Sequence, residues 1–132
     1  MPTIGNRFVV DTSAVIAFRR GTTAAREAFL SAELLYLPTI ALGELYYGAH
    51  NATNSERSIG ELKELLPAFA IVPVDGTTAR CYGEIKSRLR KAGTPIPEND
   101  IWIAAIANQM SLPLLARDDH FKAISEVHNL QV

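Results

Sequence analysis

Four acidic residues stand where carboxylates could do chemistry, because each follows an expected strand or lies in an expected apolar helix. They are Asp11, Glu44, Asp100 and Asp118. Gathering carboxylates in a folded protein costs free energy unless a cation compensates their charge or their pKa values rise. If the four side chains converge, a bound divalent cation is the simplest explanation, and phosphodiester hydrolysis is the simplest chemistry. Oxygen ligands favour Mg²⁺ or Mn²⁺ over zinc, which prefers His and Cys.

Asp11 and Glu44 can each be interpreted as purely structural residues. Asp11 follows an apolar run and could cap the next helix. Thr12 and Ser13 could cap that helix instead, so both interpretations of Asp11 stand. Glu44 would ordinarily be an exposed helical glutamate, but its neighbours are apolar or small, which favours a functional role. Gly43 costs the helix roughly 1 kcal/mol and indicates that something approaches that turn closely.

Asp100 and Asp118 also have structural interpretations, because each lies at the boundary of an expected element. Asp100 precedes the most apolar helix of the chain, Ile101–Met110, and could cap it, although Asn99 could do so equally well. Because a helix this apolar is expected to be buried, its first turn should face a crowded place, which favours a functional role for Asp100. Asp118 follows the expected strand Pro113–Ala116 and could be a turn aspartate.

Length and composition predict one domain spanning residues 1–132, with a sizeable core. The hydrophobic fraction is 48% and the charged fraction 20%, as in ordinary globular proteins. The net charge of -1 gives no global positive field, so a nucleic-acid role would need a local basic patch or a metal. Cys81 is alone, which excludes an intrachain disulfide. With no apolar stretch long enough to span a bilayer, we expect a cytoplasmic protein that does not contact the membrane.

Short apolar strands alternate with helical patterns along the whole chain. The expected strands are Phe8–Val10, Leu34–Leu37, Ala70–Val74, Pro113–Ala116 and, at an edge, Leu130–Val132. The expected helices are Ala14–Phe18, Thr22–Leu30, Pro38–Tyr47, Asn54–Phe69, Asp75–Gly93 and Ile101–Met110. This alternation predicts an α/β three-layer sandwich, in which helices cover both faces of a parallel sheet of four to five strands. Active sites of such sheets lie beyond the carboxyl ends of the strands, where Asp11 and Asp118 are expected.

Four segments together resemble the PIN domain, in particular the small VapC-type toxin ribonucleases of toxin–antitoxin pairs. They are residues 8–13, 41–45, 97–105 and 114–118, the last followed by Phe121. The resemblance implies that the metal-site acids are Asp11, Glu44, Asp100 and Asp118. It places a site hydroxyl on Thr12 or Ser13, and a supporting polar residue on Asn99. Ala116 departs from the family pattern, which usually has Thr or Ser there.

The resemblance also implies partners: an RNA substrate, a small cognate antitoxin and a second copy of the chain in a homodimer. The antitoxin would lie against the third and fourth helices, although their apolar residues could simply fill the core. Those residues are Leu42, Leu45, Tyr46, Tyr47, Leu62 and Leu65. Positive charge for RNA could come from Arg19, Arg20 and Arg117, or from Lys86, Arg88, Arg90 and Lys91. Of these, Arg117 beside Asp118 is the best supporting candidate, whereas His50, His120 and His128 show no ligand spacing and are interpreted as surface or structural residues.

Two other functions are compatible with parts of the pattern. A haloacid-dehalogenase-type phosphatase also has an aspartate after its first strand, but it needs a second one where this chain has Ser13. A non-catalytic PIN-fold module could use the same fold only to dock a partner. Retention of all four acids speaks against such a module, because a scaffold gains nothing from clustered like charges.

Overall fold

The computed structural model describes residues 6–132. Its sheet consists of β1 (Arg7–Val10), β2 (Leu34–Pro38), β3 (Ala70–Val72), β4 (Leu114–Ala116) and β5 (Asn129–Gln131). Its α-helices are α1 (Thr12–Arg19), α2 (Thr23–Ser31), α3 (Thr39–His50), α4 (Ser55–Leu65), α5 (Gly76–Lys91) and α6 (Glu98–Met110). Two 3₁₀ turns, η1 (Leu66–Ala68) and η2 (Asp119–Ala123), complete the described elements. None of the helices in this part of the chain is long and apolar enough to cross a membrane.

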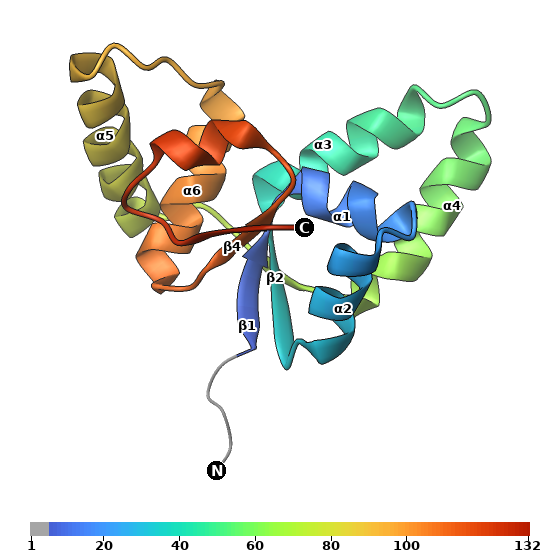
Figure 1. Cartoon of the computed structure of the whole chain (residues 1–132). Coiled ribbons are helices and arrows are strands. Elements are labelled where there is room, and N and C mark those ends of the chain that lie inside the picture. Colours follow the sequence, from blue (N-terminus) through green and yellow to red (C-terminus); the bar gives the residue numbers. More distant parts are fainter. Residues whose placement is uncertain (1–5) are drawn as a thin grey trace.

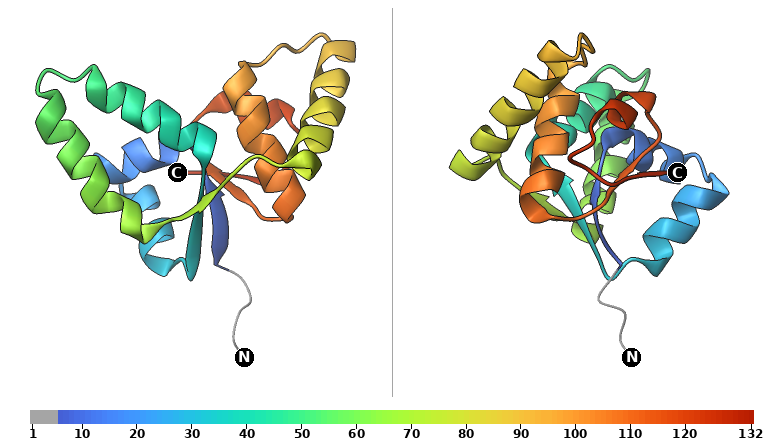
Figure 2. Two further views of the ribbon diagram at one scale, coloured as in Figure 1. Left: turned by 180° about the vertical axis from the view of Figure 1, so that it is seen from behind. Right: turned by 60° about the vertical axis from the view of Figure 1, so that its left-hand side comes forward.

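The strands form one parallel sheet in the order β3-β2-β1-β4-β5. The strand β1 is central, with Val9 opposite Tyr36 on one side and Leu114 on the other. All carboxyl ends therefore meet at a single edge of the sheet. Helices α1 to α4 lie on one side of the strands and α5 and α6 on the other, as both Figure 1 and the reverse view in Figure 2 show. The predicted α/β sandwich is confirmed.

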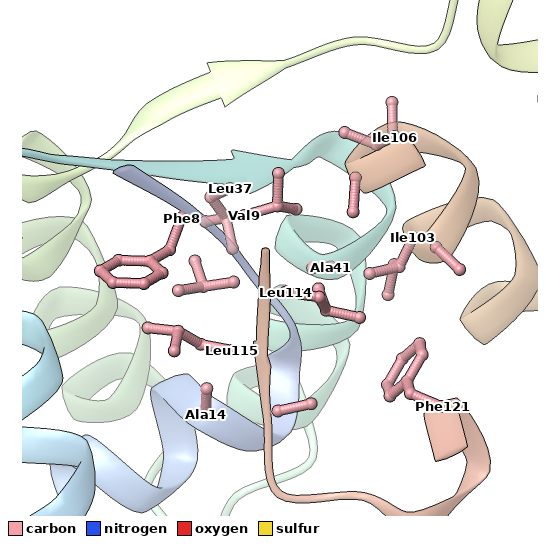
Figure 3. Packing of buried hydrophobic residues seen from close by; sticks show 14 of the residues in the cluster. Phe8, Val9, Ala14, Leu37, Ala41, Ile103, Ile106, Leu114, Leu115 and Phe121 are labelled. Atoms are coloured by element: carbon pink, nitrogen blue, oxygen red, sulfur yellow. The ribbon is translucent and has the colours of Figure 1, made fainter. Parts of the chain in front are cut away.

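The core occupies both faces of the central strands. Successive residues of a strand point to opposite faces, and in β4 Leu114 points towards Ile103 of α6 whereas Leu115 points towards Ala14 of α1 (Figure 3). All four side chains are buried. Phe121, from η2, is fully buried beside α6 and anchors the segment that follows β4. Helices therefore pack against both faces of the sheet close to the edge that carries the acids.

Several element boundaries differ from the sequence prediction by a few residues, and three helix boundaries have a clear physical cause. Asp11 itself caps α1, because its Oδ2 accepts a hydrogen bond from the Ser13 amide at 3.0 Å. Helix α6 begins at Glu98, before both expected caps, because the extended backbone of Pro97 serves as its N-cap. The helix expected to reach Phe69 ends at Leu65 and continues as η1, since a proline interrupts the α-helical hydrogen bonds there.

Candidate active site

The strand order brings the first and last acids together. Asp11 directly follows β1, and Asp118 follows β4, the neighbouring strand. The two strands stay paired up to the acids, since the Asp11 amide donates to the Leu115 carbonyl at 2.9 Å. Asp11 is only 3% exposed, whereas Asp118 is partly exposed. Burial of a carboxylate beside another one is the situation that the sequence predicted for a cation site.

Asp100 reaches the same place from α6. It lies in the first turn of that helix and is 7% exposed. Burial raises the pKa of Asp100 to about 6, the hydrogen bond from His120 opposes the rise, and the charges of Asp11 and Asp118 add to it. The pKa of Asp11 is also raised, first by burial, against two hydrogen bonds from Ser13 and with further contributions from Glu44 and Asp118. The charges of Glu44 and Asp118 thus act on Asp11, and those of Asp11 and Asp118 act on Asp100, so the four predicted acids lie near one another at this edge of the sheet.

His120 was not expected at this site. Its Nδ1 lies 2.7 Å from Asp100 Oδ2 and 3.0 Å from Asp118 Oδ1. One potential ligand atom from each of these residues lies within 4.8 Å of the others. The hydrogen bond with Asp100 is the main cause that raises the pKa of His120. When it is protonated, this imidazole places a positive charge beside the two carboxylates, a contact that the interpretation of His120 as a surface or structural residue did not include.

Both candidate hydroxyls contact acids, although the resemblance had assigned the role to one or the other. Thr12 Oγ1 donates to Glu44 Oε1 at 2.8 Å and so orients the acid of α3. Ser13 Oγ donates to Asp11 Oδ2 and accepts a hydrogen bond from the Arg117 amide at 2.8 Å. Ser13 therefore ties the start of α1 to the segment between β4 and Asp118. Ala116, where the family usually has a hydroxyl, is buried within β4.

Other polar residues near the acids in sequence have different partners. Glu98 pairs with Lys86 and accepts from the Tyr82 hydroxyl, pointing along α5 rather than into the cluster. Asp119 is exposed and pairs with Lys122 at 2.8 Å. Asn99 is exposed at the start of α6.

Much of the expected positive charge is already neutralised within the chain. Arg88 binds Glu126 through two hydrogen bonds of 2.6 and 2.7 Å, and Arg19 lies 3.5 Å from Glu61. Arg117 contributes its backbone amide to the site, and its side chain is exposed. Within residues 6–132, His120 is the one basic side chain that pairs with an acid of the cluster, so a bound cation would supply the remaining counter-charge.

The donor set fits a hard divalent cation. Carboxylate oxygens come from two strand ends and two helices, and burial, with a smaller contribution from neighbouring acids, raises the pKa values of the two most buried ones, Asp11 and Asp100. Such oxygens are the ligands that Mg²⁺ and Mn²⁺ prefer, and an imidazole nitrogen beside them is compatible with Mn²⁺.

A parallel α/β fold with clustered acids at the carboxyl edge of its sheet defines the class of this protein. The family model of the PIN domain matches residues 8–127, and the chain belongs to this family. It is 32% identical over 114 residues to ribonuclease VapC2 of Haemophilus influenzae, covering 85% of this chain and 86% of that protein. It is 28% identical over 126 residues to ribonuclease VapC5 of Mycobacterium tuberculosis, covering 94% and 92%.

A solved structure shows the same architecture. The crystal structure of VapBC-5 from Mycobacterium tuberculosis, a member of the VapBC family of toxin–antitoxin systems, aligns with a TM-score of 0.79 at 26% identity. The alignment covers 96% of this chain and 99% of the other. The resemblance seen in the sequence is therefore confirmed. The phosphatase alternative is not favoured, since Ser13 is a hydrogen-bond donor to Asp11 and not a second acid.

Proposed function

We propose that this protein is a divalent-metal-dependent endoribonuclease, the toxin of a toxin–antitoxin pair. The observation that carries the proposal is the convergence of Asp11, Glu44, Asp100 and Asp118, from four separate elements, at one edge of the sheet. The names of the curated relatives, which are ribonucleases, support RNA as the substrate.

The residues of the site would hold and orient the reacting groups. Asp11, Asp100 and Asp118 are the proposed ligands of Mg²⁺ or Mn²⁺, with Glu44 as a further ligand or as the group that positions water. If these residues held such a cation, it would supply positive charge for activating water and stabilising the leaving oxygen. Thr12 fixes the orientation of Glu44 through its hydroxyl. Ser13, Asn99 and Arg117 are proposed supporting residues, and Ser13 has the most direct role because it holds Asp11.

Cleavage of a labelled RNA tests the nuclease assignment. The purified chain should release fragments with Mn²⁺ or Mg²⁺ and stop when EDTA is added. Asp100→Asn should abolish cleavage, whereas Asp119→Asn, a neighbouring acid that pairs with Lys122 outside the cluster, should cleave like the parent. Retained cleavage by Asp100→Asn would contradict the metal site. RNA that binds but is never cut under any metal condition would favour a non-catalytic PIN-fold module.

An antitoxin partner and self-association complete the proposal. Structures of relatives are VapBC complexes. Of the apolar residues expected on the antitoxin face, Leu45 and Leu62 are buried in the core, whereas Tyr47 is exposed. The rest of that set is partly buried. Co-expression with the product of a neighbouring small gene should give a complex that suppresses RNA cleavage, and light scattering of the chain alone measures the expected homodimer. A chain that expresses alone without harming its host would count against the toxin role.

A further inference from the structure

An open cavity of about 660 Å³ adjoins the acidic cluster. Its lining comes from α1, α3 and α6, namely Thr12, Ile40, Gly43, Glu44, Tyr47 and Asn99. Thr12 and Glu44 belong to both the cavity and the cluster, since they are joined by a 2.8 Å hydrogen bond. A group bound in the cavity would therefore lie directly beside the proposed site of cleavage.

One face of α3 forms most of this cavity. Ile40, Gly43, Glu44 and Tyr47 follow one another at helical spacing, so they form a single stripe. Tyr47 at the end of the stripe is 73% exposed. A tyrosine ring so exposed adds little to the core, and large aromatic surfaces left open beside a reactive site are characteristic of recognition.

Gly43 leaves a notch between Ile40 and Tyr47. Glycine weakens a helix interior, and here no packing within the chain requires it, because a Cβ at this position would meet no atom within 4 Å. The close approach that the sequence indicated at Gly43 is therefore not made by another part of the described chain. It is left for a group that comes from outside.

The opposite wall supplies polar groups. Asn99 is exposed, and its side chain forms no hydrogen bond with any residue between 6 and 132. Its amide offers both a donor and an acceptor, as the edge of a nucleobase does. The cavity thus combines the exposed ring of Tyr47, the open space at Gly43 and the amide of Asn99. These features are complementary to a flat heterocycle with a polar edge, such as a nucleobase.

We propose that this cavity binds one nucleobase of the RNA next to the cleaved phosphodiester, with Tyr47 as the stacking surface and Asn99 contacting the base edge. This inference rests on the proposed ribonuclease function. Stacking on an aromatic ring accepts any base, and the amide adds preference for some bases over others. Tyr47 and Asn99 are thus positioning and specificity residues, and the acids perform the chemistry.

Steady-state cleavage of a labelled RNA by Tyr47 variants provides the first test. Tyr47→Ala should raise KM roughly 5- to 100-fold with little change in kcat, whereas Tyr47→Trp and Tyr47→Phe should stay near the parent. Leu30→Ala is the matched control, since Leu30 is 78% exposed on α2, away from the cavity. Gly43→Gln should fill the notch and raise KM in the same way, whereas Gly60→Gln, at an equally open helical glycine of α4, should not.

Abasic substrates provide a second test that a structural role of Tyr47 cannot mimic. Removing the base at one position beside the cleavage point should weaken cleavage by the parent, and the same removal should have no further effect on Tyr47→Ala. If the parent cleaves RNA but Tyr47→Ala has an unchanged KM and responds to every abasic position like the parent, the base-binding inference is overturned while the ribonuclease function stands. The inference is equally overturned if Tyr47→Ala leaves KM unchanged and loses only antitoxin binding. If the parent cleaves no RNA at all, the proposed function itself fails.

Discussion

Asp100 is a buried carboxylate that lies near other acids, and its side chain contacts His120. Its pKa of about 6 lies well above the ordinary value for aspartate. A raised pKa means that the folded state holds the proton more tightly than the unfolded state does. The stabilising contribution of protonated Asp100 is therefore complete below about pH 4 and is lost as the pH rises through about 6. The raised pKa of His120 acts in the same direction, since its stabilising charge is also lost on raising the pH.

Asp100→Asn should accordingly stabilise the metal-free protein at neutral pH. Replacing a buried charge by a neutral isostere should raise the free energy of unfolding by about 2 kcal/mol at pH 7. The gain should vanish towards pH 4, where the parent carboxyl is protonated. Urea unfolding in EDTA at several pH values measures it. Asp119→Asn, exposed and paired with Lys122, should show no such pH-dependent gain, and a lower stability of Asp100→Asn at pH 7 would mean that Asp100 is a structural residue.

Two substitutions of Asp11 should separate its charge from its role as a helix cap. Asn keeps an oxygen that can accept from the Ser13 amide, whereas Ala does not. Both variants should lose RNA cleavage, but Asp11→Ala should be less stable than Asp11→Asn by about 1 kcal/mol, the usual contribution of an N-cap. Thermal unfolding in EDTA checks the difference. Equal stabilities would show that the cap hydrogen bond contributes nothing to α1.

At the scale of residues, sequence reasoning identified the acids but not all of their partners. Asp11 and Asp118 follow apolar strands, a pattern that is visible in the chain. His120 escaped detection because its position is set by η2, a single irregular turn whose geometry has no periodic signal. The sequence leaves open whether Asp11 is a helix cap or a site residue, and in the structure it caps α1 and also lies beside other acids.

Among the elements, η2 is held by contacts from Arg88 that bear directly on the geometry of the site. It carries His120, and Asp118 is its N-cap. Arg88 of α5 holds the region through a 3.1 Å hydrogen bond to the Ala123 carbonyl and two hydrogen bonds to Glu126. A bidentate guanidinium–carboxylate pair fixes geometry better than a single contact. The basic residue expected to attract RNA thus serves to position the loop that bears one acid of the site.

Arg88→Ala should therefore loosen η2 more than it weakens the fold. We expect a loss of about 1 kcal/mol in the free energy of unfolding and clearly faster amide exchange across residues 118–127. Manganese affinity, measured by calorimetry, should fall several-fold. Arg80→Ala is the matched control, because Arg80 lies on the same helix and, among residues 6–132, forms its ion pair with Glu84 alone. Unchanged exchange in η2 would refute the positioning role.

The elements themselves were largely readable from the sequence. Apolar runs indicated β1 to β4, because parallel strands covered on both faces have few polar positions. The edge strand β5 contains two polar residues and lies one residue earlier than the sequence indicated. The start of α6 was missed, since Pro97 offers no capping side chain and its helix-starting role depends on backbone geometry. Capping propensity alone could not distinguish Asn99 from Asp100. In the structure Asn99 lines an open cavity, whereas Asp100 lies in the acidic cluster.

For the whole molecule, cation binding should report directly on stability. A ligand that binds only the folded state stabilises it by about 2.7 kcal/mol at a hundred times its Kd. Mn²⁺ should thus raise the unfolding temperature of the parent and leave that of Asp100→Asn nearly unchanged. Because protons compete for Asp100, the affinity should decline roughly tenfold per pH unit below about 6. A pH-independent effect of Mn²⁺ would place the cation elsewhere.

The central position of β1 has a consequence for synthesis of the protein. Its neighbour β4 comes more than a hundred residues later, and the Ser13 hydroxyl meets the Arg117 amide across 104 positions of sequence. While the chain is still emerging from a ribosome, the last acid and the strand that aligns it are absent. A growing polypeptide is therefore expected to leave the message being translated intact until β4 and Asp118 have been synthesised.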